Sequence, residues 1–70
     1  MKKIYIEPPF IKLEQFLKLA CLVSSGGEAK VLIQNGQVSV NNEICLMRGK
    51  KLHGGEIIAL GTENIEVAVK

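Results

Sequence analysis

Residues 24–53 read SSGGEAKVLIQNGQVSVNNEICLMRGKKLH. This segment predicts a capped short helix over residues 25–34, a strand-turn-strand over 37–44 and a basic loop over 48–51. A helix face, a tight turn and a cationic loop are therefore expected close together on a small scaffold. Such a surface can grip folded nucleic acid without an aromatic platform or a catalytic pocket.

The helix in this segment has both a start signal and a stop signal. Ser25 and Glu28 have the Ser-x-x-Glu spacing of a capping box, which satisfies two otherwise unpaired backbone donors. Gly36 supplies the left-handed residue at which helices commonly end. On the outer face, Lys30 and Gln34 stand one turn apart, so a charged group and a hydrogen-bonding group share one strip.

A first helix is predicted near residues 12–22 and packs against the second helix, near residues 26–35. On its outside, Glu14 and Lys18 are expected to form a favourable i, i+4 pair. Its apolar side chains have the spacing of a core-facing stripe, and they are Leu13, Phe16, Leu17, Ala20 and Cys21.

The rest of the chain alternates with a period of two, which is typical of strands. Strands are expected at residues 3–7, 37–40, 43–46, 56–60 and 65–69, and Asn41-Asn42 forms a hairpin turn because asparagine tolerates positive φ. The predicted fold class is α+β, with two short helices packed on a small, mostly antiparallel sheet of four or five strands. The predicted core consists of Leu13, Phe16, Leu17, Ala20, Ala29, Leu32, Ile33, Val38, Val40, Ile57 and Leu60.

Seventy residues, 47% of them hydrophobic, are expected to form one domain over residues 1–70, either a complete protein or one excised module, and a monomer. Glu7-Pro8-Pro9 ends the first apolar run too early for a signal peptide, and no stretch approaches the length of a membrane span. Cys21 and Cys45 lie in apolar stretches, so two buried, reduced thiols in a cytoplasmic protein are expected. One histidine and no Cys-x-x-Cys pair leave a zinc site without ligands, and neither metal nor cofactor is expected.

Catalytic chemistry has little support, and the chain is not expected to be an enzyme. The serines lack an oriented base, because the single histidine, His53, lies in a turn without a spaced acid. Gly26-Gly27 before a helix can offer backbone amides to a phosphate, but the Lys-Ser or Lys-Thr of a nucleotide-binding loop is absent. This helix start is better interpreted as a point that touches a nucleic-acid backbone.

The charge is distributed unevenly. Six cations face three carboxylates between residues 12 and 53, whereas three carboxylates face Lys70 alone from residue 54 onward. Lysine and arginine contacts to phosphate give affinity and orientation. Three aromatic residues are too few for a base-stacking platform, which favours folded RNA over a single strand. On charge alone, however, a solvated mixed-charge surface is the better interpretation.

Four short motifs in order resemble the RNA-binding domain of small-subunit ribosomal protein S-four, the alpha-L motif, over about residues 11–60. Lysine at position 12 replaces the usual arginine, and Asn42 replaces the usual last glycine of the turn. The motifs are Lys12-Leu13-Glu14, Ala29-Lys30, Gly36-Gln37-Val38-Ser39-Val40-Asn41-Asn42 and Gly55-Glu56-Ile57-Ile58. Three further stretches look like the short stand-alone bacterial members: Gln15-Phe16-Leu17-Lys18, Ser25-Gly26-Gly27 and Arg48-Gly49-Lys50-Lys51.

This resemblance implies a non-catalytic protein that binds structured RNA, either ribosomal RNA or an assembling ribosome. Larger members of the family carry catalytic domains that are missing here. One contiguous RNA-facing surface is expected to consist of Lys12, Gln15, Lys30, Gln34, Arg48, Lys50 and Lys51. Arg48 and the two loop lysines are expected to supply most phosphate contacts, and His53 is more simply explained as a turn residue. The predicted RNA-binding residues are Lys12, Gln15, Lys18, Ser25, Lys30, Gln34, Arg48, Lys50, Lys51 and His53.

Two other functions fit parts of the sequence. A protein-interaction module would use the same basic loop to dock an acidic partner, with a similar dependence on ionic strength. A ubiquitin-like sulfur carrier is also small and α+β, but it needs a C-terminal Gly-Gly, whereas this chain ends Ala68-Val69-Lys70.

Overall fold

The computed structural model describes residues 1–70 and contains two helices, α1 (Leu13–Leu19) and α2 (Gly26–Gln34). Helix α1 ends three residues earlier than predicted, because Cys21 adopts a left-handed φ of 60° and its N–H donates to Lys18 O. The N–H of Leu22 then donates to Leu17 O, which completes a Schellman motif. Cys21 therefore closes the helix and does not belong to its apolar stripe.

Helix α2 ends in the same way, at the glycine that the sequence indicated. Gly36 has a φ of 76°, its N–H donates to Ile33 O, and the N–H of Gln37 donates to Leu32 O. An added Cβ at Gly36 would lie 3.7 Å from Ile44 Cγ2, so the strand that follows the next turn returns across the end of this helix.

Five strands form the main sheet: β1 (Lys2–Ile6), β3 (Val38–Val40), β4 (Glu43–Ile44), β6 (Ile57–Leu60) and β7 (Glu63–Val69). Their spatial order is β1-β7-β6-β3-β4. Only the β1–β7 pair is parallel, and the other pairs are antiparallel. Asn41 and Asn42, with φ values of 52° and 70°, make the predicted hairpin turn between β3 and β4. Strand β4 ends at Ile44, two residues short of the predicted end.

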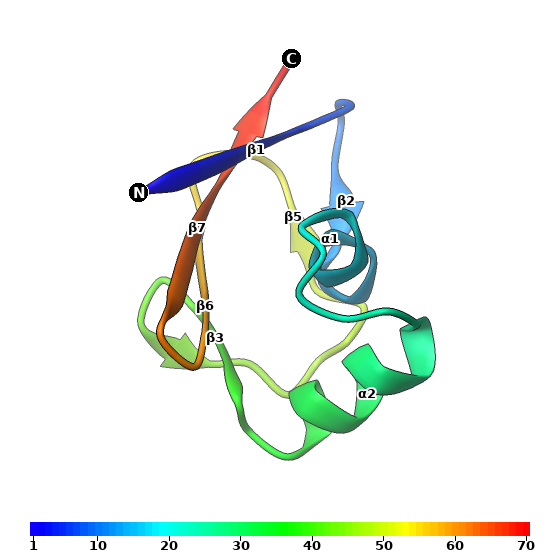
Figure 1. Ribbon diagram of the computed structural model, residues 1–70. Helices are drawn as coiled ribbons and strands as arrows, with labels where there is room; N and C mark the ends of the chain where they lie inside the picture. The colour runs from blue at the N-terminus through cyan, green and yellow to red at the C-terminus, as the bar shows by residue number, and fades with distance from the viewer.

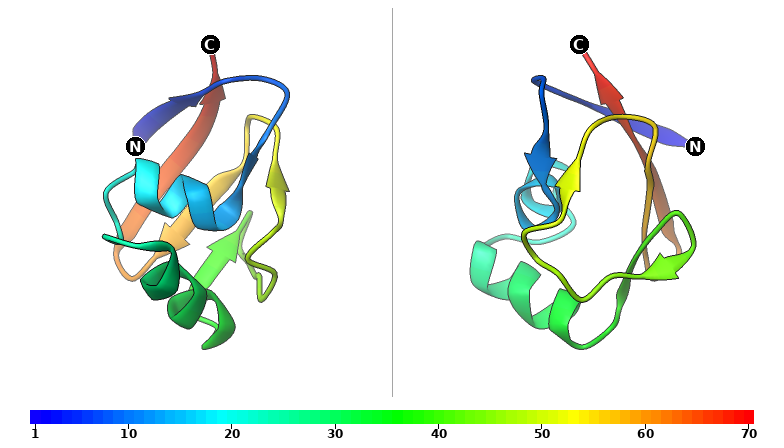
Figure 2. Two further views of the ribbon diagram at one scale, coloured as in Figure 1. Left: turned by 90° about the vertical axis from the view of Figure 1, so that its right-hand side faces the viewer. Right: turned by 180° about the vertical axis from the view of Figure 1, so that it is seen from behind.

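A second, two-stranded sheet was not predicted. Strand β2 (Ile11–Lys12) pairs antiparallel with β5 (Lys51–Leu52), so Ile11 faces Leu52 and Lys12 faces Lys51. The sequence predicts Lys51 in a loop, but this long-range pairing makes it a strand residue. The small sheet and both helices lie to one side of the five-stranded sheet (Figures 1 and 2).

Fourteen apolar side chains form one buried cluster between these layers. Eight of the eleven predicted core residues belong to it, whereas Leu32 and Leu60 are only partly buried against it. Ile57 was the wrong choice in its strand, because its neighbour Ile58 is fully buried. Strand residues alternate between the two faces, so an error of one position moves a side chain out of the core.

The two thiols are free but not buried, which corrects the expectation for them. Cys21 is exposed at the end of α1, and Cys45 is half-buried, with its Sγ atom 3.6 Å from Met47 O. Neither helix of the structure is long and apolar enough to cross a membrane.

Candidate nucleic-acid interface

The basic loop between β4 and β5 is attached to the start of α1. The first backbone N–H groups of a helix have no hydrogen-bond partner within the helix. Here, carbonyl oxygens of the loop are the partners of two of these N–H groups. The N–H of Leu13 donates to Lys50 O at 2.8 Å, and that of Glu14 donates to Arg48 O at 3.0 Å. The N–H of Lys12 is satisfied by Gln15 Oε1 at 3.3 Å. The backbone of the basic loop is therefore held against a helix, although its side chains are exposed.

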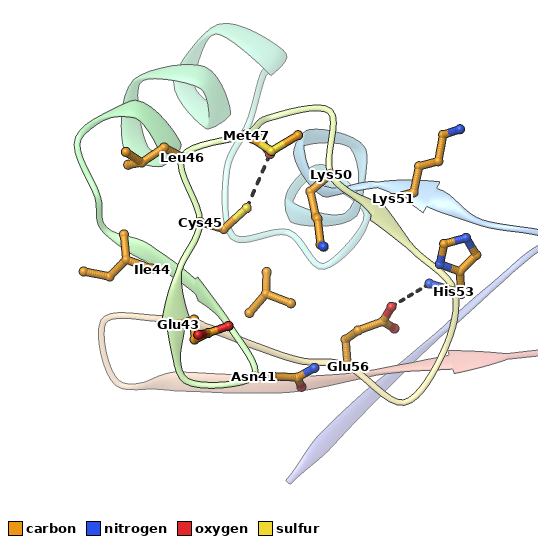
Figure 3. A pocket seen from close by; sticks show the side chains of 11 residues that line it. Asn41, Glu43, Ile44, Cys45, Leu46, Met47, Lys50, Lys51, His53 and Glu56 are labelled. Atoms are coloured by element: carbon orange, nitrogen blue, oxygen red, sulfur yellow. Dashed lines mark hydrogen bonds between the residues drawn. The ribbon is translucent and has the colours of Figure 1, made fainter.

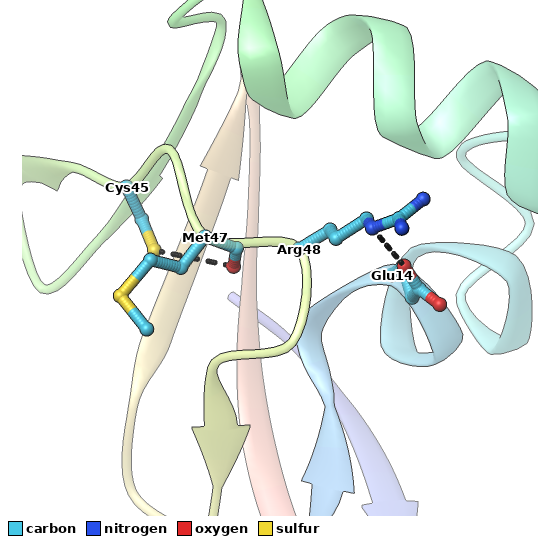
Figure 4. Close-up of polar contacts among 4 residues, drawn as sticks. All are labelled: Glu14, Cys45, Met47 and Arg48. Carbon is cyan, nitrogen blue, oxygen red and sulfur yellow. Dashed lines mark hydrogen bonds and ion pairs between the residues drawn. The ribbon is translucent and has the colours of Figure 1, made fainter.

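An ion pair also bridges the loop and the helix. Arg48 Nε lies 3.7 Å from Glu14 Oε2, and the terminal guanidinium nitrogens have no hydrogen-bond or ion-pair partner (Figure 4). The predicted pair between Glu14 and Lys18 does not form, because Glu14 turns toward the loop. The loop thus approaches the carboxylate that sequence reasoning had assigned to Lys18.

The small sheet brings two more lysines to the same end of α1. Lys12 and Lys51 are directly paired across β2 and β5. Lys51 Nζ lies 4.9 Å above the centre of the Phe10 ring, and this ring lies 6.1 Å from the imidazole of His53. A cation above an aromatic ring is attracted by the ring quadrupole, which contributes about 0.5–1 kcal/mol at an exposed site.

Six of the ten predicted contact residues are therefore linked around the start of α1, and all of them are exposed. We call this group the basic surface; it consists of Lys12, Gln15, Arg48, Lys50, Lys51 and His53. Its side chains do not all point the same way. A groove lies between the loop and the β3–β4 hairpin; Lys50 extends into this groove, whereas Lys51 points away from it (Figure 3).

The other four predicted residues lie on the remaining parts of the two helices. Lys30 and Gln34 are exposed on α2, and no hydrogen bond or ion pair joins them to the loop. Lys18 lines a shallow depression at the far end of α1, together with Ser24 and Glu28. Ser25 caps α2 by accepting a hydrogen bond from the N–H of Glu28 at 3.1 Å.

The capping box at α2 differs from the prediction in its second half. Glu28 Oε1 accepts from the N–H and hydroxyl of Ser24, at 2.8 and 3.0 Å, and not from the N–H of Ser25. The backbone and side-chain hydrogen bonds from Ser24 lower the pKa of the Glu28 carboxyl. A phosphate at this helix start would therefore meet a carboxylate.

Glu56 organises the turn that follows β5, and sequence reasoning had not given it this role. Its carboxylate accepts from the N–H of His53 at 2.8 Å and from that of Gly54 at 2.7 Å. Burial raises the pKa of Glu56. Hydrogen bonds from the backbone N–H groups of His53, Gly54 and Glu56 itself, together with the charge of His53, lower that pKa by more than burial raises it, so the net shift is downward. The Gly54-Gly55-Glu56 sequence was the available signal, because two adjacent glycines can adopt the positive φ of a tight turn that brings the amides of His53 and Gly54 to a nearby carboxylate.

No group of three or more histidine, cysteine, aspartate or glutamate side chains is placed to hold a metal ion. The side chains of the basic surface carry donors and positive charge without a paired acid and base. This arrangement is suited to binding anions.

Comparison with known proteins identifies the fold. The S4 domain family model matches residues 4–68, a wider range than the predicted 11–60. The "Probable ribosome maturation protein RlbA" of Bacillus subtilis (strain 168) is 42% identical over 57 residues, which cover 81% of this chain and 80% of the Bacillus protein. The solution structure of YbcJ from E. coli, described as having an alfaL motif involved in RNA-binding, superposes with a TM-score of 0.74 at 26% identity over 97% of this chain and 87% of YbcJ. The predicted alpha-L fold is confirmed.

Proposed function

The chain belongs to the S4 domain family, as its resemblance to ribosomal protein S-four had predicted, and from this we propose that residues 1–70 act as one non-catalytic domain that binds structured RNA. The observation that carries the proposal is the attachment of the basic loop to α1 through Leu13 and Glu14. A loop that is already ordered loses less conformational entropy when it binds than a mobile one does.

Arg48, Lys50 and Lys51 supply most of the phosphate contacts in this proposal. Their backbone is fixed, but their exposed side chains can adjust to the spacing of phosphates along a folded RNA. The free end of the Arg48 guanidinium can donate two parallel hydrogen bonds to one phosphate. Lys12 adds charge beside Lys51, and Gln15 and His53 contribute at the margin of the basic surface.

The exposed residues of the helices extend this contact. Lys30 and Gln34 on α2 offer a cation and an amide to the RNA backbone, and Lys18 and Ser25 form an outer part of the interface. Glu28 reduces the positive potential near Ser25, so we rank Lys18 and Ser25 below the basic surface in their contribution to affinity.

The target that we favour is ribosomal RNA or a ribosome assembly intermediate in the bacterial cytoplasm, bound by a monomer without a cofactor. The names of the Bacillus and E. coli relatives support this choice, one through ribosome maturation and the other through RNA binding. Ultraviolet crosslinking of the tagged protein in cells, followed by sequencing of the bound RNA, tests it. We expect enrichment of defined ribosomal RNA segments, and RNA in proportion to its cellular abundance would contradict the proposed target.

A protein-interaction module is the second candidate, and one observation favours it. Ile44, Leu46 and Met47 are each more than half exposed next to the basic loop, and clustered exposed apolar side chains often mark docking sites. Pull-downs with and without RNase separate the two functions. Partners that disappear after RNase treatment are bridged by RNA, whereas an acidic partner that remains would support the protein-interaction function.

A further inference from the structure

A groove of about 450 Å³ lies beside the basic loop, between the β3–β4 hairpin and the turn that follows β5 (Figure 3). Its five apolar lining residues are Val40, Ile44, Cys45, Leu46 and Met47, and its polar lining includes Lys50 and Glu43. The side chains of Ile44 and Leu46 point away from the middle of the groove (Figure 3). The groove is therefore lined by both apolar and polar groups, with a charged side chain on each of two sides.

The charges on these two sides are opposite and unpaired. Lys50 extends into the groove from the loop, and Glu43 faces it from the hairpin (Figure 3). Neither side chain forms a hydrogen bond or an ion pair. At the lower side, the Glu56 carboxylate accepts from the N–H groups of His53 and Gly54, and Asn41 Oδ1 accepts from the N–H of Ile57 at 2.9 Å. The Asn41 side-chain amide nitrogen keeps its donors free.

A complementary ligand has hydrogen-bond donors at one end, a negative charge at the other and a flat apolar body between them. A nucleotide meets all three requirements. We propose that the groove receives one unpaired nucleotide of the bound RNA, with an amino group of its base donating to Glu43 and its phosphate lying against Lys50. This inference rests on the proposed RNA-binding function and adds a choice of base to it.

The lining explains which bases fit. A carboxylate only accepts hydrogen bonds, and guanine presents two adjacent donors to it, the N1–H and the N2 amino group. Adenine and cytosine present one amino group each. Uracil presents a single N–H between two carbonyl oxygens, which the carboxylate repels. The sulfur atoms of Met47 and Cys45 suit the face of a base, because sulfur makes favourable contacts with aromatic rings. Guanine is therefore the preferred base and uracil the least preferred.

The test uses fluorescein-labelled RNA hairpins that share one stem and differ in a single bulged nucleotide. Guanine, inosine, adenine, cytosine and uracil bulges are compared with a fully paired stem by fluorescence anisotropy at one salt concentration. We expect the guanine bulge to bind about tenfold more tightly than the uracil bulge or the paired stem, as one charge-assisted hydrogen bond would give. Inosine lacks the N2 amino group and should lose part of this preference.

Two variants assign the preference to the groove. Glu43→Gln keeps the shape of the side chain but should bring the guanine-to-uracil ratio below about threefold. Glu63→Gln removes another exposed carboxylate, at the start of β7, and should leave the ratio unchanged. Equal binding of all hairpins by the wild-type protein would overturn the groove inference but not RNA binding, and so would an unchanged ratio in Glu43→Gln. Failure to bind any hairpin would overturn the proposed function as well.

Discussion

The Nε atom of Arg48 lies 3.7 Å from the Oε2 atom of Glu14, across the junction between the basic loop and α1 (Figure 4). The backbone repeats this contact, because the N–H of Glu14 donates to Arg48 O. The arginine side chain is 54% exposed and the glutamate side chain 31%, so the ion pair itself adds little stability. Its effect is to orient the guanidinium while leaving the outer nitrogens for a ligand.

Replacing Glu14 by glutamine should tighten RNA binding. The change removes a carboxylate that competes with phosphate for Arg48, and an exposed pair of this kind contributes at most about 1 kcal/mol, which corresponds to a factor of about five. Titration of labelled RNA at fixed salt measures it. Glu63→Gln is the control for the loss of one negative charge elsewhere. Weaker binding by Glu14→Gln would mean that the orientation of Arg48 by Glu14 contributes more to affinity than release of Arg48 from that carboxylate.

Replacing Phe16 by alanine should cost about 3–5 kcal/mol of the free energy of unfolding. The Phe16 ring is fully buried in the core that joins α1 to the sheet. Tyr5→Ala is the matched control, since Tyr5 is 56% exposed and its loss should have a much smaller effect. Urea unfolding followed by circular dichroism compares the two, and equal decreases in stability would contradict this packing of Phe16.

Gly54 should not accept a side chain. Its φ is 128°, and an added Cβ would lie 2.6 Å from Val69 Cγ2. Gly54→Ala should therefore lower the free energy of unfolding by about 2 kcal/mol or more, through backbone strain and overlap. Gly49→Ala serves as the control, because an added Cβ there meets no atom within 4 Å. The thermal midpoints of the two variants provide the measurement, and a Gly54 variant as stable as the Gly49 variant would refute this geometry.

The Glu56 carboxylate should make stability depend on acid pH. Its pKa is lowered in the folded state from 4.5, so its contribution is complete above that value and is lost as the pH falls through the lower folded pKa. Glu56→Gln cannot ionise, and it should be less stable than the wild-type protein at pH 7 by a margin that narrows in acid. Urea unfolding at intervals from pH 7 to about pH 3 follows that margin. A margin that stayed constant over this range would disagree with the role given to Glu56.

The features that the sequence predicted correctly depend on neighbours in the chain. The Ser25 cap and the left-handed Gly36 satisfy backbone groups within a few residues of themselves, and Asn41 and Asn42 adopt the positive φ of a two-residue turn. The pairing of Lys12 with Lys51 joins segments about 40 residues apart, and no sequence pattern near either residue predicts this pairing. Cys21 was misplaced for a different reason. Its position continued the apolar spacing of α1, but the Schellman motif had already ended the helix.

The same distinction between local and long-range features applies to the candidate site. Composition and spacing were enough to select Arg48, Lys50 and Lys51, because exposed cations gather in one short run. The partner of Glu14 could not be predicted, since the helical neighbour Lys18 and the distant Arg48 compete for it. The groove depends on the distance between a hairpin and a loop, so the unpaired Glu43 became a candidate only in three dimensions.

The most direct test of the central claim replaces Arg48, Lys50 and Lys51 together by alanine. Affinity for the RNA segment most enriched by crosslinking is measured at several salt concentrations, next to a control that exchanges Lys2, Lys3 and Lys70 for alanine and so removes the same charge outside the basic surface. We predict that the loop variant remains folded, binds at least about tenfold more weakly, and has a salt slope lower by about one unit for each phosphate that it no longer neutralises. A folded loop variant with the affinity and salt slope of the control would contradict this prediction.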